Sequence, residues 1–209
     1  MRRFTGFVGI LVMAAALGAG CPSQEPEPKQ EQKKDMDMEQ PTGNPVVVIE
    51  TSMGTIKAEL WAKEAPATVA NFLGYVDRKF YDGLIFHRVI KGFMAQGGGF
   101  DANMQKKPTG PPIKNEATAA LRNDAGTLAM ARTQDVDSAT AQFYINLENN
   151  TFLNHKDETA AGFGYCAFGR VIEGMDVVRK IGKVKTGIAS GMKDVPVKTV
   201  EIKSIRRAE

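Results

Sequence analysis

One arginine in this chain stands where arginines are uncommon, inside an apolar segment. The segment from Leu84 to Ile90 reads LIFHRVI, so that Arg88 lies among strand-forming apolar residues. Arginine is rarely buried unless it has a partner or a task. A guanidinium held at the edge of an apolar core could donate hydrogen bonds to a carbonyl oxygen or to a nitrogen that has lost its conjugation.

The residues that follow could build a pocket around this arginine. After a turn expected at Gly92, the chain places Phe93, Met94 and Gln96 close together and then continues with three glycines, 97–99. Glycines allow a neighbouring segment to approach closely. The combination suits a pocket for an apolar ring next to a carbonyl group. The simpler alternative is a buried strand with a glycine turn and a salt-bridged arginine.

Composition favours one soluble globular domain with additional segments. The chain has 209 residues, 43% of them hydrophobic and 24% charged. Its 27 basic residues include Arg2 and Arg3, which lie in a segment expected to be removed; without them 25 basic residues face 24 acidic ones. The mature protein is therefore nearly neutral, and we expect no nucleic-acid partner.

The sequence gives little support for a metal site or for thiol chemistry. The chain has two cysteines, Cys21 and Cys166, and two histidines, His87 and His155, with no spacing typical of a metal site. We expect no disulfide between the cysteines, no metal and no cofactor. Because His87 precedes Arg88 on a strand, its side chain should point to the opposite face and have a structural role.

The N-terminus has the pattern of an export signal. Residues 1–20 combine a basic start with an apolar core that is too short to span a membrane, and the sequence LGAG precedes Cys21. This resembles a bacterial lipoprotein signal, in which the cysteine becomes the lipidated first residue, although glycine replaces the usual leucine three positions before it. An ordinary cleaved signal peptide and a retained apolar helix are the alternatives. Residues 21–45 are rich in Pro, Glu, Gln and Lys, which predicts a disordered linker.

Strand periodicity dominates the remaining segment, 46–209. A hairpin is expected from 46–49 and 56–60, and further strands from 84–90, 126–132, 138–146, 162–171 and 197–205. Apolar residues recur at helical spacing in only two places. The first helix has Pro66 in its first turn and carries Val69, Phe72, Leu73 and Val76, and the second carries Met175, Val178 and Ile181. A segment from 101 to 115 reads as a surface loop. Many strands and two separated helices predict a mainly β fold, a closed antiparallel barrel capped by helices.

A family resemblance rests on this same central stretch. The sequence FHRVIKGFMAQGG, from Phe86 to Gly98, resembles the signature of the cyclophilins, the cyclophilin-type peptidyl-prolyl cis-trans isomerases. The resemblance extends over essentially all of 46–205, with similar blocks at LAMART (128–133), SATAQFYIN (138–146) and YCAFG (165–169). It implies an eight-stranded barrel with two helices and activity on X-Pro bonds without a cofactor.

The resemblance also implies roles for individual residues. Arg88 matches the catalytic arginine. The other matching positions are substrate-binding, and they are Phe93, Met94, Gln96, Ala131, Arg132, Gln142, Tyr144, Phe152, Leu153 and Tyr165. Three of these depart from the eukaryotic pattern, because Tyr144, Phe152 and Tyr165 stand where phenylalanine, tryptophan and histidine are usual. Such changes are of the bacterial type and should preserve activity while weakening binding of cyclosporin, the family's cyclic undecapeptide inhibitor.

The sequence therefore predicts a monomeric peptidyl-prolyl isomerase that is exported and lipid-anchored at Cys21, on the periplasmic side of a bacterial membrane. Its partners would be proline-containing unfolded or flexible polypeptides. One alternative is a binding module or holdase chaperone that grips such segments, with turnover incidental. Another is a fixed partner in an envelope complex.

Overall fold

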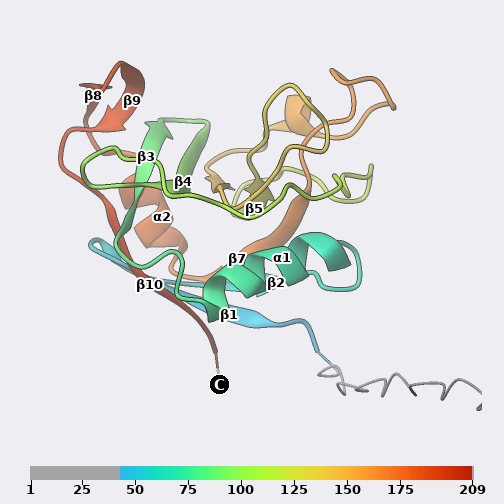
Figure 1. Ribbon diagram of the computed structural model, residues 1–209, viewed down its shortest axis with the longest axis horizontal. Helices are drawn as coiled ribbons and strands as arrows, with labels where there is room; N and C mark the ends of the chain where they lie inside the picture. Colours follow the sequence, from blue (N-terminus) through green and yellow to red (C-terminus); the bar gives the residue numbers. More distant parts are fainter. Residues whose placement is uncertain (1–42, 209) are drawn as a thin grey trace, which may run out of the picture. The chain divides into compact units, whose positions relative to one another are not determined.

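A closed barrel of eight antiparallel strands forms the centre of the computed structural model, which describes residues 43–208 (Figure 1). Around the barrel the strand order is β1-β10-β3-β4-β6-β5-β7-β2. The expected fold class is thereby confirmed. The barrel strands are β1 (Val46–Thr51), β2 (Gly54–Leu60), β3 (Leu84–Ile90), β4 (Met94–Asp101), β5 (Thr127–Met130), β6 (Phe143–Asn146), β7 (Ala167–Glu173) and β10 (Glu201–Arg207).

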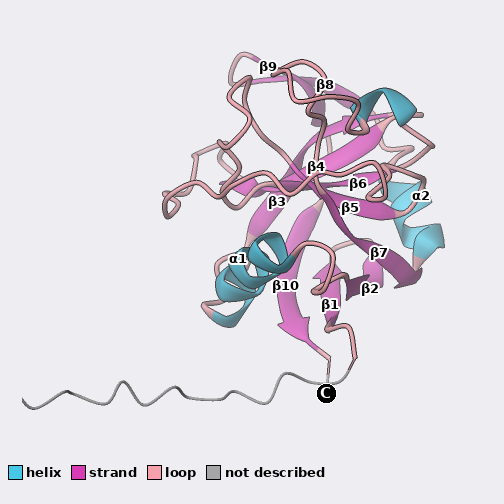
Figure 2. Cartoon of the chain, turned by 90° about the vertical axis from the view of Figure 1, so that its right-hand side faces the viewer, coloured by secondary structure: helices cyan, strands magenta, loops and turns pink. Residues whose placement is uncertain are grey.

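Two α-helices lie against the barrel, as expected. Helix α1 (Pro66–Asp77) begins with Pro66, whose fixed φ suits a first helical turn. It packs on the side of β10, whereas α2 (Met175–Ile181) packs near β2 (Figure 2). The apolar stripe of α1 faces inward and includes the four apolar residues that the periodicity singled out, Val69, Phe72, Leu73 and Val76.

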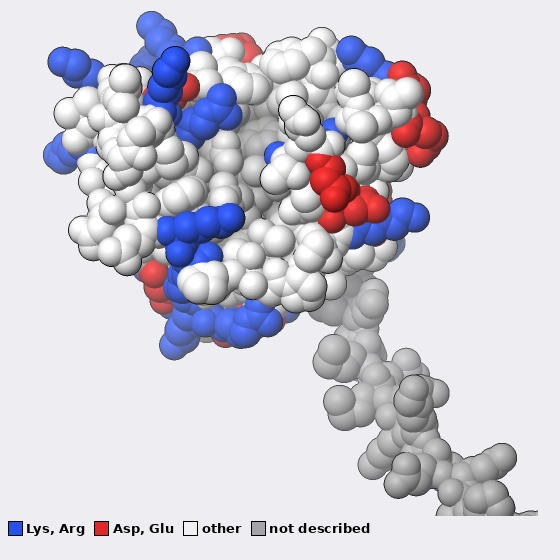
Figure 3. Space-filling view, turned by 45° about the horizontal axis from the view of Figure 1, so that its top comes forward, with Lys and Arg blue, Asp and Glu red and all other residues white. Residues whose placement is uncertain are grey.

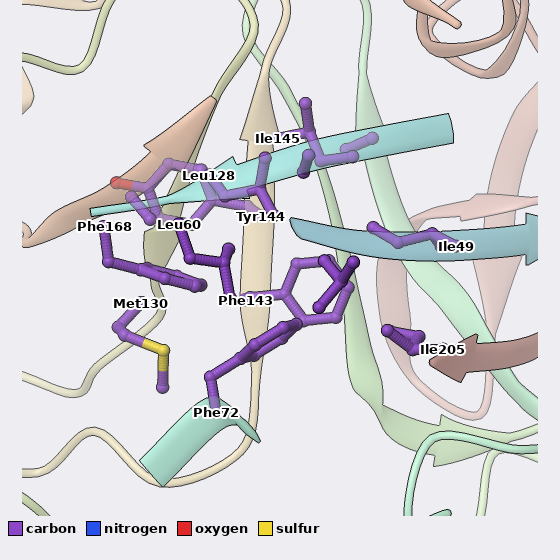
Figure 4. Close-up of a cluster of buried hydrophobic side chains, with 14 of the residues drawn as sticks. Ile49, Leu60, Phe72, Leu128, Met130, Phe143, Tyr144, Ile145, Phe168 and Ile205 are labelled. Carbon is purple, nitrogen blue, oxygen red and sulfur yellow. The ribbon is translucent and has the colours of Figure 1, made fainter. Parts of the chain in front are cut away.

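Aromatic packing joins α1 to the barrel core (Figure 4). The ring of Phe72 lies 5.3 Å from the ring of Tyr81, 5.4 Å from Phe143 and 5.1 Å from Phe168, measured between centroids. All four side chains are essentially inaccessible to solvent. Such tilted and edge-to-face contacts favour one orientation of the helix on the barrel.

Two strand elements of the structure were not expected from the sequence. The glycine-rich segment after Met94 forms strand β4, because its neighbours β3 and β6 supply backbone hydrogen-bond partners on both sides. A further hairpin, β8 (Thr186–Ala189) and β9 (Met192–Pro196), forms a separate two-stranded sheet and packs against β3. A short 3₁₀ helix, η1 (Thr151–Leu153), was also not expected.

The predictions for residues 1–42, including the signal, Cys21 and most of the linker, lie outside the described residues. Within 43–208, no helix is both long enough and apolar enough to cross a membrane.

Candidate functional site

Arg88 lies on β3 directly opposite Gln96 of β4. Its Nη1 donates to Oε1 of Gln96 at 3.5 Å, and Nε2 of Gln96 donates to Oε1 of Gln142 at 2.9 Å. The Arg88 side chain is 40% exposed, so it belongs to the surface and not to the barrel core. Gln142 thus holds the amide of Gln96, and that amide contacts one edge of the guanidinium.

A cavity of about 110 Å³ lies beside this guanidinium. Figure 3 shows the surface hollowed next to Lys and Arg side chains. The cavity combines apolar groups with a few polar ones, and its lining residues are Arg88, Phe93, Met94, Gln96, Ala131, Arg132, Tyr144, Leu153 and Tyr165. They come from β3, the turn between β3 and β4, β4 itself, β6, η1 and the segments that follow β5 and precede β7.

Two of the sequence-predicted site residues lie outside this lining. Gln142 reaches the site indirectly, through its hydrogen bond to Gln96. Phe152 is 62% exposed, and its ring packs against Phe93 with 5.5 Å between centroids. The structure therefore gathers nine of the predicted residues around one cavity and places these two beside it.

A backbone ledge forms one rim of the cavity. The N–H of Ala131 donates to the carbonyl of Gln142 at 3.0 Å, which extends the pairing of the two strands beyond β5. Arg132 uses its guanidinium on the protein itself, donating from Nε to the Gly164 carbonyl at 3.0 Å and covering the ring of Tyr165 at 4.7 Å. A second groove of about 590 Å³ continues from this rim, lined by Arg132, Thr133, Gln134, Ala160, Ala161 and Tyr165.

One important residue behind the cavity was missed by the sequence analysis. Asn123 is completely buried, and its Nδ2 donates to the carbonyls of Leu153 and Tyr165. Its Oδ1 accepts a hydrogen bond from the Tyr144 hydroxyl at 2.9 Å. Asn123 therefore connects three of the lining residues. It lies in a loop with no periodic pattern, so the sequence held no signal for it.

The Tyr144 hydroxyl is consequently not a free group on the wall. It points to Asn123, and burial raises the pKa of the phenol well above its ordinary value of 10.0. The hydroxyl stays protonated and acts as a structural donor, which leaves the ring to line the cavity.

Two groups that could do acid–base or nucleophilic chemistry, His87 and Cys166, are buried. Desolvation lowers the pKa of His87 to about 4, and the ring lies away from the cavity, 4.7 Å from the ring of Phe100. Desolvation also raises the pKa of the Cys166 thiol to about 11. Among residues 43–208, no cluster of His, Cys, Asp and Glu has the geometry to hold a metal ion. The cavity itself offers the Arg88 guanidinium, the Gln96 amide and apolar walls.

The structure thus combines a closed antiparallel barrel with a small surface pocket, which the Arg88 guanidinium lines together with apolar side chains. Residues 46–207 match the family model of the cyclophilin type peptidyl-prolyl cis-trans isomerases. The chain belongs to this family. It is a peptidyl-prolyl cis-trans isomerase, and proline-containing peptides are its ligands.

Bacterial members of the family are similar over nearly their whole length. The chain is 58% identical over 160 residues to peptidyl-prolyl cis-trans isomerase cyp18 of Streptomyces antibioticus, covering 77% of this chain and 96% of the relative. It is 51% identical over 164 residues to peptidyl-prolyl cis-trans isomerase B of Escherichia coli, covering 78% of this chain and all of the relative.

A solved structure has the same architecture. A cyclophilin type isomerase of Cryptosporidium parvum, crystallised in the presence of the dipeptide Ala-Pro, superimposes with a TM-score of 0.64 at 26% identity. The match covers 78% of this chain and 99% of the other.

Proposed function

We propose that Arg88 is the catalytic group, that the adjoining cavity grips the proline ring, and that the enzyme acts on exported proteins while anchored through Cys21. The observation that carries the catalytic part is the position of the Arg88 guanidinium, on the wall of the same small cavity as Phe93, Met94 and Leu153. A proline ring in that cavity brings its imide bond next to the arginine.

The physical problem is the planarity of the imide. Conjugation opposes rotation with a barrier of roughly 20 kcal/mol. X-Pro bonds populate both isomers but exchange over tens of seconds or more. In the twisted state the proline nitrogen has lost conjugation and becomes a hydrogen-bond acceptor, which the planar amide nitrogen is not. A donor held next to that nitrogen therefore stabilises the twisted state more than the planar states.

Arg88 can supply this donor without a change in protonation, because a guanidinium stays charged throughout the ordinary pH range. A thousandfold acceleration requires about 4 kcal/mol. One hydrogen bond from a charged donor contributes about 1.5–3 kcal/mol. The remainder falls to the apolar walls, which fix the ring and exclude the water that would solvate the planar, charge-separated amide.

The rim residues would hold the peptide on either side of the rotating bond. Ala131 and Arg132 present an extended backbone edge, and the amide of Gln96 lies next to Arg88. With the ring fixed and the flanking chain held, only the bond between them is left to turn. Measurements of peptide binding can test this division of roles between the cavity and its rim.

Titration with the dipeptide Ala-Pro tests the location of the site. In amide chemical-shift mapping on the full chain, the largest shifts should fall on Met94, Gln96 and Ala131. Phe93→Ala should weaken the titration, whereas Ile172→Ala, on β7 away from the cavity lining, should leave it unchanged. Shifts concentrated away from the cavity would rule out this site.

The proposal of an exported, anchored enzyme rests on sequence features. A basic start, a short apolar core and small residues before Cys21 support export and lipidation. The linker at 21–45 gives a reach of roughly 25–30 Å if it behaves as flexible chain, enough to hold the barrel clear of lipid headgroups. Clients would be exported polypeptides whose folding waits for proline isomerisation.

Cell fractionation tests the anchor. The wild-type protein should be found in the membrane fraction of a bacterial host, and Cys21→Ala should move it to the soluble or secreted fraction. Cys166→Ala removes the other thiol, which is buried in the barrel, and should leave fractionation unchanged. A Cys21→Ala protein that stays with the membrane would refute lipidation at this residue.

A further inference from the structure

The β8–β9 hairpin has an irregularity close to the active-site cavity. Its two strands meet in a tight turn at Ser190 and Gly191, where both residues have positive φ, as two-residue hairpins of this kind require. Below the turn the pairing changes register, because Gly187 pairs with Val195 whereas Ala189 pairs with Met192. Two residues of β9 therefore lie opposite one residue of β8, which is a β-bulge.

Asp194 lies in this bulge. It is one of four residues other than glycine in the described part of the chain with positive φ, at 63°. Asp tolerates this conformation better than most residues, but it is still an uncommon one. Bulges re-aim a side chain and are common next to active sites. Here the hairpin packs against β3, the strand that carries Arg88.

The re-aimed carboxylate faces the catalytic arginine. Oδ2 of Asp194 lies 3.9 Å from Nε of Arg88, with the two side chains 41% and 40% exposed. Gln96 meets the same guanidinium at Nη1. Within residues 43–208 no hydrogen bond engages Nη2. Protein groups thus approach two of the three nitrogens, Gln96 of β4 at Nη1 and Asp194 of β9 at Nε.

We infer that Asp194 is a positioning residue for isomerisation, which fixes the tilt of the Arg88 guanidinium through charge attraction at Nε. Without it, the single contact to Gln96 would leave the guanidinium free to rotate about its own side chain. The distance of 3.9 Å is too long for a direct hydrogen bond, so the attraction is coulombic. The inference rests on the catalytic role of Arg88 proposed above.

The size of the effect follows from the exposure of the pair. Ion pairs at this degree of exposure contribute modestly and are screened by salt. Removing the carboxylate should therefore lower the rate about two- to fivefold at low ionic strength. Because the oriented donor acts on the twisted state, the loss should appear in kcat, with KM little changed.

Four variants of the full chain test this in a protease-coupled assay with an uncharged proline tetrapeptide. Asp194→Asn keeps the size and tolerates the backbone conformation, and Asp194→Gly relieves any strain there. Asp194→Glu restores the charge. Asp176→Asn is the matched control, since it removes one carboxylate and one ion pair, that with Lys180, away from the cavity lining.

The expected result is a lower kcat for the Asn and Gly variants, recovery in Asp194→Glu, and no change in Asp176→Asn. The deficit should shrink in high salt, where wild type loses the same attraction. An Asn variant with wild-type kcat at low salt, or a deficit confined to KM, would overturn the inference. Arg88→Ala is measured in parallel: if that variant keeps full turnover, the proposed catalytic role itself fails, whatever Asp194 does.

Discussion

Phe93 and Phe152 are packed against each other, yet the structure gives them different positions at the site. Phe93 is partly buried and lines the cavity, whereas Phe152 lies outside the lining and is largely exposed. The family pattern named both as substrate contacts. At the scale of single residues, the direct consequence is that truncating the two rings should have unequal effects.

Phe93→Ala should lower kcat/KM by about tenfold, because burying an aromatic or aliphatic side chain contributes about 1.5–3 kcal/mol and part of that contact is with the substrate ring. Phe152→Ala, its matched control, should change kcat/KM by less than about threefold. Steady-state kinetics on folded variants checks both. Equal losses in the two would mean that the bound peptide extends over Phe152, and an unchanged Phe93→Ala would remove the ring from the proposed pocket.

At the scale of elements, β4 shows how three glycines serve the site. A Cβ on Gly97 would lie 3.1 Å from the carbonyl oxygen of Ile85, and one on Gly98 would lie 2.8 Å from the ring of Tyr81. At Gly99 the Cβ would lie 2.5 Å from Cδ of Gln142. The last of these connects the strand to the proposed catalytic group, since Gln142 holds Gln96 and Gln96 holds Arg88.

Gly99→Ala should therefore displace Gln142 and loosen the guanidinium without touching the cavity. Loss of one hydrogen bond of about 0.5–1.5 kcal/mol corresponds to a fall in kcat/KM of about two- to tenfold. Gly74→Ala on α1, where a Cβ would have no neighbour within 4 Å, is the control and should keep wild-type kinetics. Wild-type kinetics in Gly99→Ala would show that the Gln142 contact is dispensable.

The same elements show how far sequence reasoning reaches. The bounds of β3, the buried stripe of α1 and the turn at Gly92 follow from periodicity and turn chemistry, and the structure confirms them. Strand β4 was not expected because glycines carry no periodic signal, although β3 and β6 pair with its residues 94–97 on both sides. The fold of this region depends on pairings that no local pattern records.

Only a family motif predicted the full lining of the cavity. Residue types alone indicated an arginine near apolar side chains, and the motif indicated which distant residues would join it. Asn123 and Asp194 were missed, because one lies in an irregular loop and the other owes its direction to a bulge. Both act through long-range geometry, which spacing along the chain does not encode.

At the scale of the whole molecule, the fold buries one histidine, His87, in its neutral form. His87 is 1% exposed, and among the described residues its Nδ1 has no hydrogen-bond partner. Burial lowers its pKa from 6.5 to about 4. The position of His87 away from the cavity agrees with the expectation from strand alternation.

This histidine predicts a pH dependence of stability. Between pH 6.5 and about 4 the unfolded chain takes up a proton at His87 that the folded protein does not, so the free energy of unfolding falls as the pH falls. The loss amounts to about 3 kcal/mol across that window. Denaturant unfolding at several pH values should show this slope in wild type and a flatter curve in His87→Leu. His155 is present in both proteins. Equal slopes of the unfolding free energy against pH in the two would therefore exclude the His87 contribution.

The rate of X-Pro isomerisation by Arg88→Ala tests the central claim most directly. In a protease-coupled assay on the full chain, kcat/KM should fall about ten- to hundredfold, the equivalent of one charge-assisted hydrogen bond to the twisted imide. Circular dichroism should show an intact barrel, and Arg170→Ala, which removes an exposed arginine paired with Glu59 outside the cavity lining, should keep wild-type kinetics. An Arg88→Ala protein that is folded and turns over within about threefold of wild type would contradict the account.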